Sequence, residues 1–248
     1  MQTANSNRIY TPPDLDYLCG LAEDVLEASR IRSGESVNDS AVNQTGGTLI
    51  RPGGRDCYPA FWVRDFAMSV DCGLMADDEL RNGLALIAAT QCLEDQTLPS
   101  GIRIPRGAIA DHINFDGTPV FLPGTYDPGE LDPVWGMQPP FDNAFWFIHA
   151  AWHANNGERV CNPLVLAGYK PALRCNGERV CNPLESLRLA FDSVPADPAT
   201  GLVVCDENNR GVSFGFMDAV VHTGHLLFAS LLRFQAAREM AEMTGVAG

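Results

Sequence analysis

The chain has 248 residues, 46% of them hydrophobic and 19% charged, a balance that excludes a disordered chain and is enough to bury a core. Its formal net charge at pH 7 is −14, so it lacks the basic surface that binds nucleic acid or an anionic membrane. We therefore expect neither as a partner, whereas a neutral sugar is compatible with an acidic surface.

The first predicted helix spans residues 11–32. Thr11 supplies an N-cap and Pro12 a first helical position, and apolar residues then recur at helical spacing. The same periodicity predicts further helices over residues 58–74, 78–94, 140–155, 183–194 and 212–243. The helix over residues 140–155 is apolar on almost every side, which is typical of a core helix.

Short turns alternate with long loops between these helices. Short extended pieces are expected in the loops, at residues 48–50, 102–104 and 109–115. No strand–helix–strand rhythm is present, and the alternation is typical of stacked helical hairpins that carry function on one rim. The sequence therefore predicts a single all-α domain over residues 1–248, with short β decorations in its long loops.

One internal repeat is perfect over nine residues. The sequence Asn-Gly-Glu-Arg-Val-Cys-Asn-Pro-Leu occurs at residues 156–164 and again at residues 176–184. A single exact copy is not a solenoid, which needs at least three units. We interpret it as a recent local duplication or an assembly artefact, and we expect residues 156–182 to form an inserted loop.

The segment over residues 58–67 carries the sharpest local signal. Arg64 and Asp65 stand side by side among aromatic residues, where a loop becomes a helix. Sugars are bound in this way, because an aromatic face stacks on the sugar ring while charged groups fix the hydroxyl directions. The alternative is a structural ion pair at a helix start.

Residues 61–67, Phe-Trp-Val-Arg-Asp-Phe-Ala, resemble the tryptophan-x-arginine-aspartate signature of glucoamylases and related six-hairpin glycosidases. The resemblance implies an all-α toroid of helical hairpins, (α/α), of which this chain holds the N-terminal half. It also implies that Arg64 and Asp65 hold the non-reducing sugar where cleavage occurs, and that Trp62 forms part of the pocket wall.

Residues 139–145 resemble the segment of the same family in which an inner helix begins at the sugar site. Asp142 and Asn143 would then bind substrate, whereas the alternative for Asp142 is an ordinary N-cap. Two acidic loops lie between the motifs, and we expect them to line a saccharide cleft through Asp111, Asp127 and Glu130.

Asp218 is the candidate catalytic acid. In six-hairpin glycosidases the acid lies on a loop that enters a helix, and inverting hydrolysis also needs a second carboxylate to activate water. Phe214 and Phe216 would desolvate Asp218 and raise its pKa. The alternative is a structural aspartate at a helix start.

Two pairs of histidines are candidates for metal ligands. His149 and His153 are four residues apart and His222 and His225 three apart, so each pair can share a helix face. No His-Glu-x-x-His or Cys/His cluster at zinc spacing accompanies them. We therefore expect neither a metal nor a cofactor.

The chain departs from the resembled family in length, because it supplies about six of twelve helices. The general base belongs to later helices, so catalysis by this chain alone is left open, and the helices would expose an apolar inner face. The leading hypothesis is a glycoside hydrolase-like protein that acts on or binds a neutral saccharide by an inverting mechanism. The alternatives are a non-catalytic or degenerate carbohydrate-binding relative, or a sugar epimerase or lyase that would use His222 and His225.

The expected location is the cytoplasm, and the sequence does not indicate an oligomeric state. The longest apolar run, residues 144–152, is far too short to span a bilayer. The first residues lack the pattern of a signal peptide, and the eight cysteines include no Cys-x-x-Cys pair, which favours reduced thiols.

Overall fold

The computed structural model describes residues 10–37, 41–53, 58–125, 127–129, 133–156, 183–212 and 220–245. These residues contain six α-helices: α1 (Pro12–Ser29), α2 (Val63–Val70), α3 (Asp77–Thr90), α4 (Asn143–Asn156), α5 (Pro183–Ser193) and α6 (Leu227–Thr244). A short 3-10 helix, η1 (Pro133–Trp135), precedes α4. The predicted loop over residues 156–182 lies almost entirely outside the described residues.

Eleven short strands pair into five small antiparallel sheets within the described residues. The three-stranded sheet has the order β5 (Ala60–Trp62), β8 (His112–Asn114) and β9 (Pro119–Val120). The two-stranded pairs are β1 (Arg30–Ile31) with β4 (Leu49–Ile50), β2 (Ser36–Val37) with β3 (Ala41–Val42), β6 (Gln96–Thr97) with β7 (Arg103–Ile104), and β10 (Val204–Cys205) with β11 (Gly224–His225).

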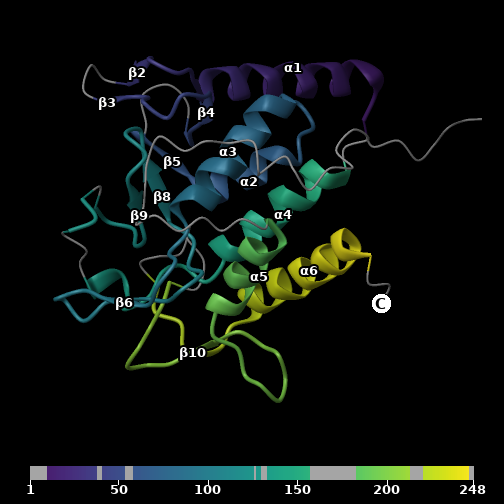
Figure 1. Cartoon of the computed structure of the whole chain (residues 1–248). Helices are drawn as coiled ribbons and strands as arrows, with labels where there is room; N and C mark the ends of the chain where they lie inside the picture. Colours follow the sequence, from purple (N-terminus) through teal and green to yellow (C-terminus); the bar gives the residue numbers. More distant parts are fainter. Residues whose placement is uncertain are drawn as a thin grey trace, which may run out of the picture.

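The predicted all-α toroid is therefore wrong, because the chain has a mixed α/β fold. The segments between the helices pair with one another, and β5 and β8 bury Phe61 and Ile113 at facing positions. The helices do not form a ring of consecutive hairpins either. Instead α4 runs through the middle of the molecule and contacts α2, α3, α5 and α6 (Figure 1).

The predicted core character of the helix over residues 140–155 is confirmed. Phe145, Phe147 and Ile148 of α4 are each at most 1% exposed, on different sides of the helix. Neighbours surround α4 because its sequence offers no polar face to solvent along this stretch. Burial of each such side chain stabilises the fold by roughly 1.5–3 kcal/mol.

Two helix starts differ from the prediction. Helix α2 begins at Val63 rather than near residue 58, because Ala60–Trp62 pairs with β8. Helix α6 begins at Leu227 rather than near residue 212, and Gly224–His225 forms a strand with β10.

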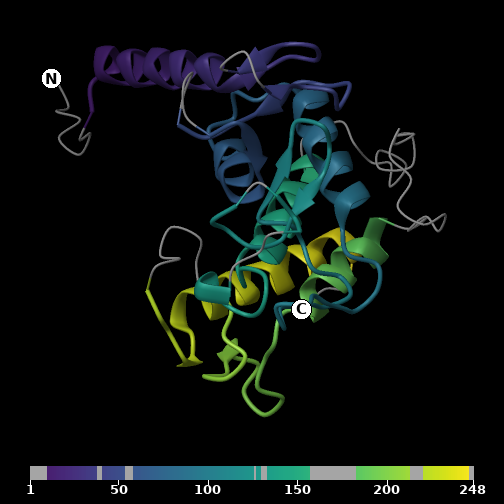
Figure 2. The same cartoon turned by 90° about the vertical axis from the view of Figure 1, so that its left-hand side faces the viewer.

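Two helices carry exposed apolar residues. Helix α1 lies along one end of the molecule in both views (Figures 1 and 2), with Leu18, Leu21 and Val25 between 44% and 57% exposed. Helix α6 exposes Leu231 and Phe234. No helix in the described ranges combines the length and apolarity needed to cross a membrane.

The core position of α4 leads to a stability prediction. Phe147→Ala should lower the free energy of unfolding by about 3–5 kcal/mol, because it leaves a cavity among four helices. Urea unfolding followed by circular dichroism measures the loss. Phe234→Ala is the matched control, since Phe234 is 64% exposed and its loss should change stability by less than about 1 kcal/mol. Equal losses for both variants would contradict the central position of α4.

Candidate functional site

Arg64 lies in the first turn of α2, and its side chain is buried. Its guanidinium donates to both carboxylate oxygens of Asp142, with Nε–Oδ2 at 2.5 Å and Nη2–Oδ1 at 3.1 Å. Nη2 also donates to Oδ1 of Asn143 at 2.9 Å. A bidentate, charge-assisted pair of this kind fixes both partners in orientation, so it holds the start of α2 against the start of α4.

Asp111 adds a second carboxylate to this buried cluster. Its Oδ1 lies 3.7 Å from Arg64 Nη2, and its Oδ2 lies 3.0 Å from His112 Nδ1. Asn143 Nδ2 donates to the carbonyl oxygen of Ala110 at 2.9 Å. The entry to β8 is thereby joined to the same two helix starts.

The charge of Arg64 is stabilised inside the protein. Burial alone would lower the pKa of Arg64, but the charge and hydrogen bonds of Asp142, together with Asp111, outweigh burial and raise it. Arg64 is therefore a cation at neutral pH, and it compensates the two buried aspartates.

Asp142 precedes α4 at the N-cap position, as its alternative interpretation expected. Its carbonyl oxygen accepts from the N–H groups of Phe145 and Trp146. Its carboxylate, however, accepts from Arg64 and from the indole Nε1 of Trp146, which lies 3.2 Å away. The side chain therefore serves the buried cluster while the backbone begins the helix.

Asp65 follows Arg64 but lies in a different environment. Its side chain is only partly buried. Burial raises the pKa of Asp65 to about 6, with Arg64 opposing the rise and the carboxylates of Asp111 and Asp142 adding to it. Asp65 is thus a carboxyl group that is half-protonated near pH 6, at the outer edge of a buried charge cluster.

An aromatic surface lies at the same end of α2. Trp62 is the N-cap residue of α2, three positions before Asp65, and it is partly exposed. Its ring stacks on His112 with centroids 4.5 Å apart, and it meets the edge of Tyr58 at 4.9 Å. Tyr58 is 53% exposed. An aromatic ring and a carboxyl group with a raised pKa therefore both belong to the start of α2.

The structure thus brings together Trp62, Arg64, Asp65, Asp111, Asp142 and Asn143. Asp127 is separate: it is exposed and accepts from the N–H of Gly129 in a local turn. Glu130 and Asp218, the candidate catalytic acid, lie outside the described residues. His112 and Trp146 also belong to this cluster and were not predicted, although Trp146 stands one helical turn after Asp142.

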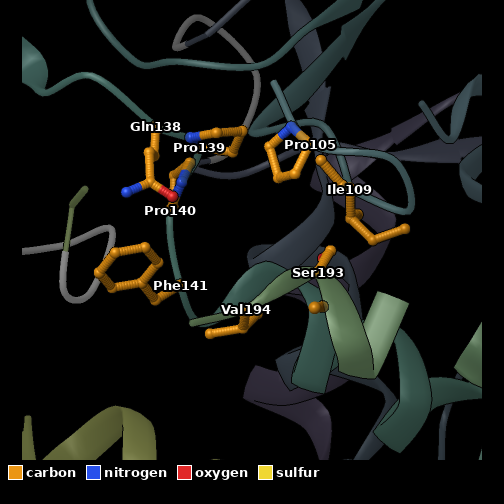
Figure 3. Close-up of a pocket in the computed structure, with 10 residues that line it drawn as sticks. Pro105, Ile109, Gln138, Pro139, Pro140, Phe141, Ser193 and Val194 are labelled. Atoms are coloured by element: carbon orange, nitrogen blue, oxygen red, sulfur yellow. The ribbon is translucent and has the colours of Figure 1, made fainter. Parts of the chain in front are cut away.

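A small hollow lies beside the segment that leads into α4 (Figure 3). It is lined by Pro105, Ile109, Pro140, Phe141 and Val194 among others, and it has room for about one water molecule, at about 10 Å³. No charged side chain and none of the predicted sugar-binding residues lines this hollow. It is too small and too apolar for a saccharide.

We compared the chain with models of protein families, with curated proteins and with solved structures, and none of the three comparisons found a match. The resemblance to glucoamylases therefore depends on two short motifs, residues 61–67 and 139–145.

Removing the central cation should destabilise the protein. Arg64→Leu leaves the buried carboxylates of Asp111 and Asp142 without their cation, so the free energy of unfolding should fall by about 3–5 kcal/mol. Urea unfolding at pH 7 measures the change. Arg188→Leu is the control, because Arg188 and Asp192 form an exposed pair whose loss should cost less than about 1 kcal/mol. A loss of that small size for Arg64→Leu would contradict the structural role of the cluster.

The raised pKa of Asp65 gives a pH dependence with a definite sign. The folded state holds this proton up to about pH 6, whereas the unfolded chain releases it near the ordinary value of 3.8. The ionised side chain therefore destabilises the fold as pH rises from 3.8 through 6.

Asp65→Asn should accordingly stabilise the protein at pH 8, by at most about 3 kcal/mol, and have little effect below pH 4. Thermal unfolding of both proteins across this pH range measures the difference. A difference that does not change with pH would show that burial does not govern this carboxyl group.

Proposed function

We propose that the chain binds a neutral saccharide at the start of α2, with Trp62 as the stacking surface and Asp65 as the polar contact. The observation that carries the proposal is that a partly exposed Trp62 and a carboxyl group whose pKa is raised to about 6, Asp65, share the start of α2. The face of an indole packs on the apolar face of a sugar ring, and a carboxyl group accepts or donates hydrogen bonds at the ring hydroxyls.

The buried cluster supports this proposal because it holds the start of α2 in place. Arg64 is only 2% exposed and directs its donors to Asp142 and Asn143, so in our proposal it positions the helix start rather than touching sugar. In our proposal the partly exposed neighbours of Arg64, Trp62 and Asp65, make the contacts with the sugar. A binding surface that is held by rigid, hydrogen-bonded elements loses little entropy when ligand arrives.

Glycoside hydrolase-like chemistry remains the leading reaction class for this site. An inverting mechanism needs a carboxyl group protonated near neutral pH and a carboxylate on the other face of the sugar. Our proposal keeps Asp218 as the candidate acid and an inverting acid/base mechanism, with a neutral α-linked saccharide as substrate.

The burial of Arg64 favours a second candidate, a carbohydrate-binding protein without turnover. In the resembled signature the arginine and aspartate hold the sugar together, whereas here the arginine lies behind the surface. Loss of that contact weakens positioning of a scissile bond more than it weakens stacking on Trp62.

We also propose the cytoplasm as the location. Cys19 and Cys72 are exposed and free. Exposed free thiols suit a reducing compartment, where disulfides do not accumulate.

Titration with maltose-, trehalose- and mannose-type oligosaccharides, followed by calorimetry and by chromatography of products, tests the function. At least one sugar should bind, and Trp62→Ala should weaken binding about tenfold, the effect of losing one stacked ring. Tyr17→Ala is the control, because Tyr17 is 70% exposed on α1, away from the site.

The outcomes separate the candidates. Binding with cleavage supports the hydrolase, and binding without cleavage supports the non-catalytic relative. Absence of binding across the panel, or equal binding by Trp62→Ala and the wild type, would refute the saccharide site.

A further inference from the structure

Three side chains from two helices that are distant in sequence meet at the end of α2 opposite Trp62. Asp71 is the C-cap residue of α2, and His149 and His153 lie one turn apart on α4. Asp71 Oδ1 is 3.0 Å from His149 Nε2 and 2.8 Å from His153 Nε2. One ligand atom from each of the three side chains lies within 4.8 Å of the other two.

A fourth side chain orients the buried histidine. Glu239 of α6, itself buried, places Oε1 2.6 Å from His149 Nδ1. Gln235 Nε2 donates to the same oxygen at 2.9 Å. A carboxylate at Nδ1 favours the tautomer that carries its proton there, which turns the lone pair of Nε2 toward Asp71 and His153.

That nitrogen faces a carboxylate oxygen of Asp71, and either a proton or a metal ion held between them satisfies both groups. We propose that Asp71, His149 and His153 form a binding site for a divalent transition-metal ion of the zinc type. The carboxylate–histidine–metal triad is completed by Glu239, which holds His149 by its far nitrogen. Two imidazoles and one carboxylate suit zinc, whereas magnesium and calcium prefer oxygen ligands alone.

The spacing and the exposure both fit such an ion. Ligand atoms about 2.1 Å from zinc in a tetrahedron lie roughly 3.4 Å apart, so the separations of 2.8 and 3.0 Å need to widen only slightly. The side chains of Asp71 and His153 are 57% and 29% exposed, which gives an ion a path from solvent and leaves room for water as a fourth ligand.

The site would join three helices. Asp71 ends α2, the histidines belong to α4, and Glu239 couples them to α6. An ion that binds only the folded chain stabilises it by mass action. The site is independent of the proposed saccharide surface, which lies at the other end of α2.

Calorimetric titration of the full chain with Zn²⁺, after treatment with a chelator, tests the site. One ion should bind per chain, and His153→Ala and Asp71→Asn should each weaken binding at least tenfold without loss of fold, since both positions are partly or well exposed. Glu239→Gln should weaken binding by about 10–100-fold while the ligands themselves remain. Zn²⁺ should also raise the melting temperature of the wild type but not of His153→Ala.

His225→Ala is the matched control, because His225 also pairs with an aspartate, Asp197, at 3.0 Å, and it lies outside the cluster of Asp71, His149 and His153. It should bind Zn²⁺ as the wild type does. Equal affinity of His153→Ala and the wild type, or no bound zinc, would overturn the proposal. A thiolate-to-metal charge-transfer band with Co²⁺ would overturn it as well, by assigning the ion to cysteines such as Cys72.

Discussion

The ion pair between Arg64 and Asp142 joins the start of α2 to the start of α4, and both side chains are at most 2% exposed. Such a pair exists only where the geometry repays the cost of removing both charges from water. Here the bidentate contact, the amide of Asn143 and the nearby Asp111 supply that compensation. Arg64 and Asp142, which are 78 positions apart, are thereby held in a fixed arrangement, and the surface beside them is held with them.

Helix α4 extends this constraint through the molecule. Its first residues meet Arg64, its middle packs among four helices, and its later turns carry His149 and His153. The two ends of α2 meet α4 at these two polar clusters, and apolar packing lies between them. A substitution in either cluster therefore affects the packing of the same two helices, α2 and α4.

The elements that were predicted correctly from the sequence are those whose formation depends on nearby residues in the chain. The periodicity of apolar residues located all six described helices, and it identified α4 as a core helix because its own sequence is apolar on every side. The errors have a nonlocal cause. Residues 60–62 form a strand only because residues 112–114 pair with them, and the assembly around α4 rather than into a ring depends on which faces meet.

The candidate site shows the same division between local and nonlocal causes. Sequence grouped Arg64, Asp65, Asp142 and Asn143, and the structure brings these residues together. The sequence alone could not show which of these residues face the core and which face solvent. Consecutive helical residues point about 100° apart, and only the packing decides which one faces the core. Arg64 faces inward, so its charge organises the interior, while Asp65 keeps some contact with solvent and its pKa is raised because most of the group is buried. Because Arg64 is buried, it holds the two helix starts together and its side chain is not exposed to a ligand. In the proposed saccharide site, Trp62 and Asp65 are therefore the residues that would contact the ligand.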